Sequence, residues 1–174
     1  MMKYPLLVLC LIGSAFSCYA VSDNVHFSGA LVAEPCTLTD ENANIHLDFG
    51  TIIESYLYEY QRTASKPFTI HLTDCDPTVY NSVAFTFQGA EDSEMPELLA
   101  LDPTSVAKGI ALGITTSEGT LLPLNKDGGY YTISPGNNDY SFAAYIQAKP
   151  SALVNRQIVV GDFSLTSTFV LNYQ

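Results

Sequence analysis

The stretch GDFSLTSTFVLNYQ, residues 161–174, decides the fold. Its odd-numbered positions are glycine, serine, apolar or aromatic, and its even-numbered positions, Val170 apart, are polar or end the chain. Because successive side chains of a β-strand point to opposite faces, this period of two predicts one long final strand from Gly161 to Tyr173 with one buried face.

The same alternation recurs earlier in the chain, whereas helical spacing does not persist. Short stretches with Gly, Asn or Pro separate the segments and indicate turns at residues 117–119, 126–129 and 134–138. We expect a helical turn only around Pro96–Ala100. Strands are predicted at Phe68–Leu72, Val83–Phe87, Ile110–Ile114, Leu121–Leu124 (paired with the previous one as a hairpin), Tyr130–Ile133 and Tyr140–Ala148.

Many short strands in one exported chain predict an all-β, antiparallel sandwich of the immunoglobulin-like kind. Such a sandwich usually adds one more strand beside the segment that ends at Tyr173, but only Gln174 follows. We therefore expect an incomplete sandwich that lacks its final strand, with an unpaired edge over an uncovered slot in the core. Native proteins pair or cover such an apolar edge, so a partner must complete it.

Composition excludes several classes of protein. Of the 174 residues, 47% are hydrophobic and the net charge is −11. This excludes a disordered tail, and a polyanion of this kind is repelled by nucleic acid.

Residues 1–20 are typical of a secretory signal, with Lys3, an apolar run and small residues before Ala20. Acylation of Cys18 as a lipoprotein is an alternative, although Phe16 fits that motif poorly. Export leaves Cys36 and Cys75 in an oxidising compartment, which predicts one disulfide, worth roughly 4 kcal/mol through restriction of the unfolded chain. A redox or metal pair would need a CxxC motif or nearby His ligands, and neither is present.

The N-terminal arm, residues 21–33, reads as an extra strand. Val25, Phe27, Gly29 and Leu31 alternate with more polar or smaller residues. Gly29, without a side chain, suits a point where two backbones pass closely. We expect this arm to fill the slot of a neighbouring subunit, a head-to-tail contact that builds a filament.

The chain resembles the pilin subunits of chaperone–usher pili, of the type 1 and P pilus kind. The resemblance spans the whole mature chain. It lies in residues 25–29 followed by Leu31, Val32 and Cys36, in residues 47–50, in residues 68–76, and in the C-terminal stretch with Gly161 fourteenth from the end and Tyr173 penultimate.

The resemblance implies an incomplete pilin domain, residues 34–174, and the disulfide between Cys36 and Cys75. It implies partners: a periplasmic chaperone that lends a strand, an outer-membrane usher, and neighbouring pilins in the cell-surface pilus. Val25, Phe27, Gly29 and Leu31 would be donor-strand residues, and basic chaperone residues would grip the carboxylate at Gln174. The edge for chaperone and neighbour would be formed by Gly161, Phe163, Leu165, Phe169, Leu171 and Tyr173.

An enzyme is the main competing class. His26, His46 and His71 are far apart, and no HExxH, GxSxG or glycine-rich phosphate loop is present, so we expect no catalysis, metal or cofactor. The acids Glu91, Asp92, Glu94 and Glu97 do not have the spacing of a calcium loop, and an exposed charged loop explains them.

A minor tip or adaptor subunit, or a receptor-binding fimbrial subunit, is the closer alternative. The arm follows the signal directly, without a separate adhesin domain. The stretch Tyr56–Tyr60 could be a contact surface, but a partly buried strand or loop explains it better.

Overall fold

The computed structural model describes residues 27–29, 31 and 33–174. The chain divides into the units Met1–Val32 and Ala33–Gln174, and the second unit is called the body below. Within the described ranges, no helix has both the length and the apolar character needed to cross a membrane.

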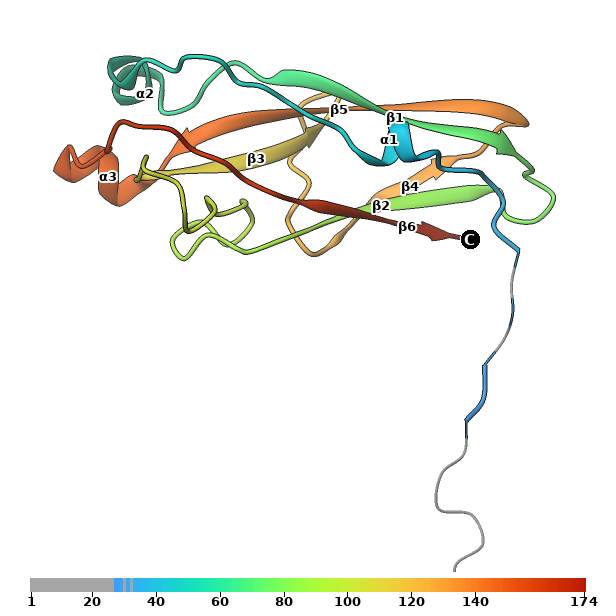
Figure 1. Cartoon of the computed structure of the whole chain (residues 1–174). Helices are drawn as coiled ribbons and strands as arrows, with labels where there is room; N and C mark the ends of the chain where they lie inside the picture. The colour runs from blue at the N-terminus through green and yellow to red at the C-terminus, as the bar shows by residue number, and fades with distance from the viewer. Residues whose placement is uncertain (1–26, 30, 32) are drawn as a thin grey trace, which may run out of the picture. The chain divides into compact units, whose positions relative to one another are not determined.

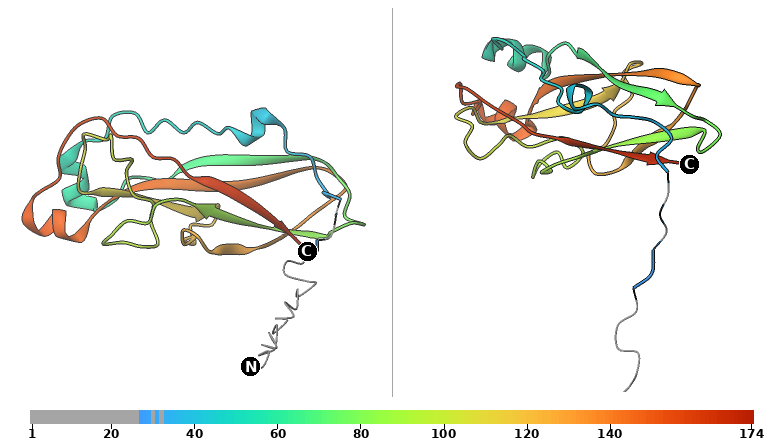
Figure 2. Two further views of the ribbon diagram at one scale, coloured as in Figure 1. Left: turned by 60° about the horizontal axis from the view of Figure 1, so that its bottom comes forward. Right: turned by 45° about the vertical axis from the view of Figure 1, so that its right-hand side comes forward.

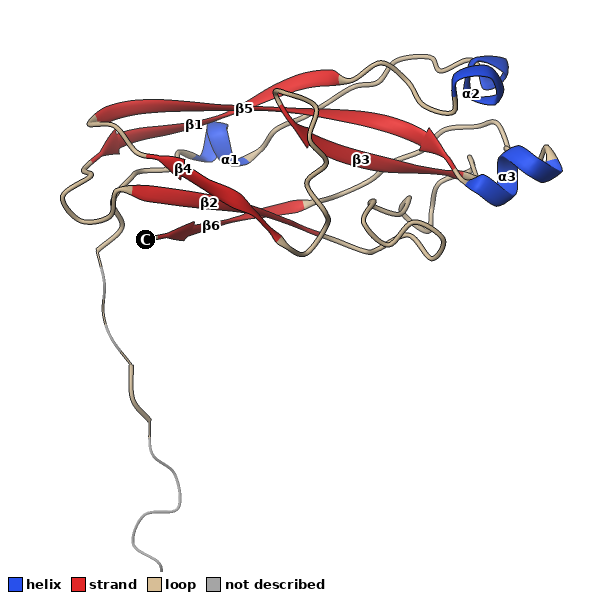
Figure 3. Ribbon diagram, turned by 180° about the vertical axis from the view of Figure 1, so that it is seen from behind, coloured by secondary structure: helices blue, strands red, loops and turns tan. Residues whose placement is uncertain are grey.

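The body consists of two three-stranded antiparallel sheets packed face to face (Figure 1, Figure 3). One sheet has the order β1-β5-β3 and the other β4-β2-β6. This mostly-β arrangement confirms the predicted fold class. The strands are β1 (Lys66–Cys75), β2 (Ser82–Gln88), β3 (Ile110–Thr116), β4 (Asp127–Thr132), β5 (Gly136–Ala148) and β6 (Thr168–Tyr173), and the helices are α1 (Asp40–Ala43), α2 (Glu54–Tyr60) and α3 (Pro150–Asn155).

The core lies between the two sheets and is aromatic at its centre. Phe142 of β5 meets Phe85 and Phe87 of β2 across the interface, with ring centroids 5.0 and 5.3 Å apart. Phe85 and Phe142 are almost fully buried. Edge-on aromatic contacts of this kind stabilise the sandwich beyond the area that they bury.

The structure joins Cys36 to Cys75 as a disulfide, as predicted. The bond ties the segment after Ala33 to the end of β1, where Thr37 and Thr73 also exchange backbone hydrogen bonds of 2.8 and 2.9 Å. Pro35 accepts a further bond from the backbone N–H of Asp76. The body therefore begins at the end of the sandwich where β1 finishes.

The strand predictions hold for β1, β2, β3 and β5, because each has one apolar face in the core. The prediction of a strand throughout Gly161–Tyr173 is wrong in its first half, since β6 begins only at Thr168. No strand forms at Leu121–Leu124, but the predicted hairpin pairing is present in short form: Thr115 bridges to Leu121, and Leu122 donates to the carbonyl of Ile114.

Two turns are shorter than predicted. β4 begins at Asp127, so Gly128 and Gly129 lie in a strand, not in a turn. A Cβ atom at Gly128 would lie 2.9 Å from the carbonyl oxygen of Phe85, which explains the glycine there as a close approach between strands. β5 begins at Gly136, inside the second predicted turn.

The helix predictions were wrong. Pro96–Ala100 holds only a turn, in which Leu98 donates to the carbonyl of Met95. Tyr56–Tyr60, expected as a strand or loop, is helical in α2, where Leu57 is buried and the rings of Tyr56 and Tyr60 lie one turn apart at 4.5 Å. The Tyr58 hydroxyl accepts the backbone N–H of Ile158, which places α2 beside the segment after α3.

Candidate functional site

The outer edge of β6 is unpaired within the described residues, because β6 has β2 as its one neighbour in the sheet. Gln174 and Ser82 exchange backbone hydrogen bonds of 3.0 and 3.1 Å. In an antiparallel ladder alternate residues bond to the same neighbour, so the even-numbered residues of β6 bond to β2. The N–H and C=O groups of Phe169, Leu171 and Tyr173 therefore point away from the sheet.

The free edge continues upstream of β6 through residues 162–167. There the even-numbered positions bond to a loop instead of a strand: Val106 donates to the carbonyl of Asp162 and Asp102 to that of Ser164, both at 2.9 Å. The Ser105 hydroxyl accepts the backbone N–H of Ser164. The odd-numbered residues thus present unpaired backbone groups on the same side as those of β6.

The odd-numbered side chains of this edge line the core side of the segment. Phe163, Leu165, Phe169, Leu171 and Tyr173 are all half-buried and pack against the core cluster, while their polar neighbours are exposed. Burial, with the nearby Glu34 carboxylate and Tyr140, raises the pKa of Tyr173 above its usual range. The predicted alternation of core-facing and exposed side chains is therefore confirmed, even in residues 163–167, which form no strand.

The second wall is residues 43–52, which the sequence did not reveal as part of a site. Leu47, Phe49 and Ile52 are half-buried against the core. Among the described residues, no backbone–backbone hydrogen bond joins residues 44–52 to the rest of the body. Lys66 Nζ instead donates to the carbonyl of Asp48, so side chains attach this wall.

A groove of about 970 Å³ lies between the two walls, bounded by residues 43–52 and by Val160–Ser167 with Phe169. Its remaining lining comes from core side chains of both sheets and of the loop before β3: Phe68, Phe87, Leu99, Leu112, Ile114 and Ala144. The C-terminal segment runs beside it from the α3 end of the body toward the opposite end (Figure 2). An apolar groove beside a free strand edge suits an extended segment that adds a strand and inserts alternate side chains.

Gly161 lets the C-terminal segment pass close to the loop before β3. A Cβ atom there would lie 2.5 Å from Cγ1 of Val106 and 3.3 Å from the backbone nitrogen of Ala107, and its φ of +152° disfavours other residues. This is the physical reason for the glycine at that position.

Gly161→Val is expected to displace the backbone of residues 161–167 from the loop before β3. Binding of a synthetic arm peptide, residues 21–33, should then weaken at least tenfold. Titration calorimetry on the purified mature chain measures the affinity. Gly119→Ala is the matched control, since Gly119 also has a positive φ but has open space around it. Equal affinities for the Gly161 variant and wild type would contradict this role.

Of the predicted donor residues, the structure describes Phe27, Gly29 and Leu31, while Val25 lies outside the described residues. Phe27 and Leu31 are 91% and 103% exposed, and none of the three belongs to a strand. The three described residues therefore form no strand within their own chain, and their role as donor residues stays a prediction.

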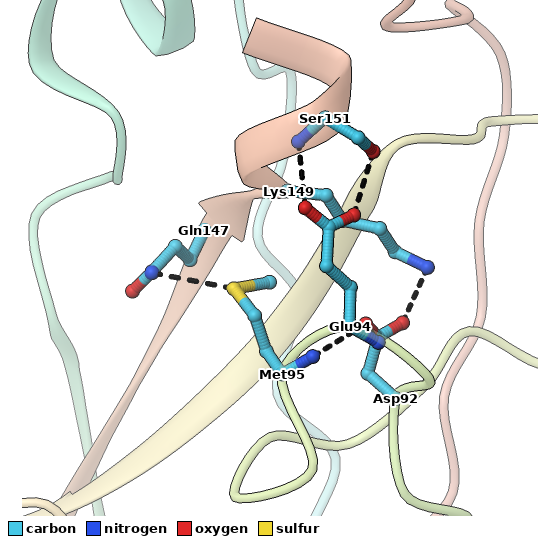
Figure 4. A network of polar contacts seen from close by, with 6 residues as sticks. All are labelled: Asp92, Glu94, Met95, Gln147, Lys149 and Ser151. Carbon is cyan, nitrogen blue, oxygen red and sulfur yellow. Dashed lines mark hydrogen bonds and ion pairs between the residues drawn. The ribbon is translucent and has the colours of Figure 1, made fainter. Parts of the chain in front are cut away.

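The acidic loop is a structural clasp: the expectation of an exposed charged loop holds for Glu91, Glu94 and Glu97 and is wrong for Asp92. Asp92 is 2% exposed, forms an ion pair with Lys149, and accepts the backbone N–H groups of Glu94 and Met95 (Figure 4). The Glu94 carboxylate accepts both the backbone N–H and the hydroxyl of Ser151 at 2.6 Å. These bonds anchor the loop to the first turn of α3.

The histidines and acids do not form a site in the part of the chain that the structure describes. His71 and Asp139 pair on the surface at 2.6 Å, and His46 is exposed on its own. Within the same residues, no three His, Cys, Asp or Glu side chains are grouped to hold a metal ion. His26 lies outside the described residues.

The family model described as "Fimbrial protein" matches residues 25–174. The chain belongs to the fimbrial protein family. The major MR/P fimbria protein of Proteus mirabilis is 33% identical over 93% of this fimbrial protein and 90% of the relative. The uncharacterized fimbrial-like protein YfcP of Escherichia coli K12 is 34% identical, and the match covers 95% of this chain and 93% of YfcP.

The crystal structure of the P pilus rod subunit PapA matches the fold of this fimbrial protein with a TM-score of 0.70 and 22% identity. The match covers 81% of this chain and all of the PapA chain. The likeness confirms the sandwich architecture and is consistent with an incomplete immunoglobulin-like fold.

Proposed function

We propose that this fimbrial protein is a structural, non-catalytic subunit of a cell-surface pilus that polymerises head to tail by donor-strand complementation and supports cell adhesion. The observation that carries the proposal is the unpaired edge from Phe163 to Tyr173 beside an apolar groove. The groove reaches core residues such as Leu112 and Phe87, and the apolar side chains of its walls stay only half-buried unless a strand covers them.

The arm, residues 21–33, is the proposed donor to a neighbouring subunit. Its apolar positions 25, 27, 29 and 31 have the period of two that the groove requires. The exposure of Phe27 and Leu31 supports this role, because exposed large apolar side chains are available to a second molecule.

Residues 1–20 are proposed to direct export into the periplasm, where a chaperone lends a strand to the same edge and an outer-membrane usher replaces it with the arm of the next subunit. The proposed pilin domain is residues 34–174. In this scheme Phe163, Leu165, Phe169, Leu171 and Tyr173 contact chaperone and neighbour in turn, and the Gln174 carboxylate meets basic chaperone residues.

Immunogold electron microscopy of cells that express the chain tests this function. Antibody against the body is expected to label surface fibres, along their shafts or at their ends. Fibres that never carry the label, with the protein retained in the periplasm, would contradict the proposal.

A further inference from the structure

The upstream half of the free edge, residues 162–167, has the side-chain alternation of a strand although it lies outside both sheets. Phe163 and Leu165 are half-buried, while the residues between and beside them are exposed, which requires an extended chain. In β6 the pairing with β2 maintains this geometry. β2 ends at Gln88, opposite Thr168, so residues 162–164 bond to the loop between β2 and β3 instead (Figure 1).

One side chain of that loop makes both of the hydrogen bonds that a strand residue would make. The Ser105 hydroxyl accepts the backbone N–H of Ser164 at 3.0 Å and donates to the carbonyl of Ser164 at 3.2 Å. Paired residues of an antiparallel ladder exchange their N–H and C=O groups in the same way, as Gln174 and Ser82 do. A hydroxyl can replace such a partner because it carries one donor and two acceptor lone pairs.

Ser105 is fixed by its own loop. It is 7% exposed, its backbone N–H donates to the carbonyl of Asp102 at 2.9 Å, and its carbonyl accepts a hydrogen bond of 2.7 Å from Lys108 Nζ. Asp102 in turn donates to the carbonyl of Ser164 at 2.9 Å. These contacts all lie within the body, so the hydroxyl is held in place before a donor strand arrives.

The orientation of Ser164 decides which way its two neighbours point. Because the backbone groups of Ser164 point toward Ser105, those of Phe163 and Leu165 point to the opposite side, where an added strand would lie. The side chains of both neighbours line the groove. An edge that is already extended binds a strand more tightly, because binding does not have to order it.

We propose that Ser105 is a positioning residue of the groove, whose hydroxyl takes the place of a strand partner for Ser164 and holds residues 162–165 ready to pair with a donor strand. The inference rests on the function proposed above and names a residue that sets the affinity of the groove. Ser105 lies outside the lining of the groove, so it acts through Ser164 and not through contact with the donor.

Ser105→Ala tests this role in the purified mature chain, residues 21–174. Without the hydroxyl, residues 162–165 are expected to be correctly extended in about one molecule in ten, and the apparent affinity for the synthetic arm peptide falls with that fraction. Titration calorimetry should therefore show about tenfold weaker binding. Wild-type affinity in the Ser105 variant would overturn the proposal.

Thr115→Val is the matched control, because it also removes one buried hydroxyl. Thr115 is 2% exposed, and its hydroxyl donates to the carbonyl of Ala143 on the face of β3 opposite the groove-lining Leu112 and Ile114. The two variants should lose similar amounts of thermal stability, whereas Thr115→Val should bind the peptide within about twofold of wild type. Equal losses of affinity would overturn the inference, because a general loss of stability would then explain both.

A double-mutant cycle locates the effect on the edge. In a chain that carries Leu165→Ala, the added Ser105→Ala should weaken peptide binding by at most about threefold, because the side chain that the hydroxyl positions is already truncated. In a chain that carries Leu171→Ala the added change should still weaken binding about tenfold, since β2 holds Leu171. Equal penalties in the two backgrounds would contradict a local role for Ser105.

The wild-type chain separates this inference from the function on which it rests. If wild type does not bind the arm peptide, the donor-strand function itself fails, and the role of Ser105 fails with it. If wild type and Ser105→Ala bind the peptide equally tightly, the groove accepts a donor strand and only the positioning role is wrong.

Discussion

Deletion of residues 21–31 is expected to abolish assembly of the mature chain while leaving its body folded. The deleted segment contains Phe27 and Leu31, two large and exposed apolar side chains of the arm, and it lies outside the body, which begins at Ala33. Size-exclusion chromatography with light scattering should show a species of single-subunit mass where wild type shows multimers. Chaperone binding should persist, because the free edge is intact.

The synthetic arm peptide serves as the control for the deletion. It should bind the deleted chain, since the groove between residues 43–52 and Val160–Ser167 is unchanged. It should also raise the thermal midpoint of that chain, because a ligand that binds only the folded state stabilises it. Continued polymer formation by the deleted chain would contradict the donor role.

Leu171→Glu is expected to prevent periplasmic accumulation of the chain. Leu171 is half-buried, lies opposite Phe85 in the sheet and points into the core. A carboxylate at an apolar position that an added strand would cover costs about 3 kcal/mol or more. Immunoblots of periplasmic extracts should show loss of the soluble protein, and Phe169→Glu should behave in the same way.

The matched control is Thr168→Glu. Thr168 precedes Phe169 in β6 but its side chain is exposed on the opposite face. Both variants add one carboxylate to β6, so they differ only in whether the new side chain faces the core or the solvent. Normal accumulation of the Leu171 variant, or equal loss of both variants, would contradict the proposed edge.

The strands of the sandwich could be predicted because their signal is local. In β1, β2 and β5 the residues that face the core alternate with the others, and alternation is visible without knowing which strands pair. The half-buried odd positions of residues 163–173 follow from the same reasoning. The disulfide could also be predicted from the sequence, because an exported chain with only two cysteines after its signal is expected to pair them.

The short helices and the acidic clasp could not be predicted because tertiary contacts create them. The Tyr58 hydroxyl of α2 bonds to Ile158, and Glu94 bonds to Ser151 in the first turn of α3. Neither helix is long enough to be stable through its own hydrogen bonds. The charged neighbours of Asp92 in the sequence predict an exposed acid, whereas its burial is compensated by the ion pair with Lys149, which is distant in the sequence, together with two local backbone N–H groups.

The sequence by itself determined an all-β body with an additional N-terminal arm of strand-like alternation. It could do so because each residue of a strand points to one face or the other according to its position in the chain. The tertiary structure decided where the open edge lies and how deep the groove beside it is. Both walls come from segments far apart in the sequence, residues 43–52 and 160–169. Their separation depends on how the two sheets pack, and no local period of the sequence records that distance.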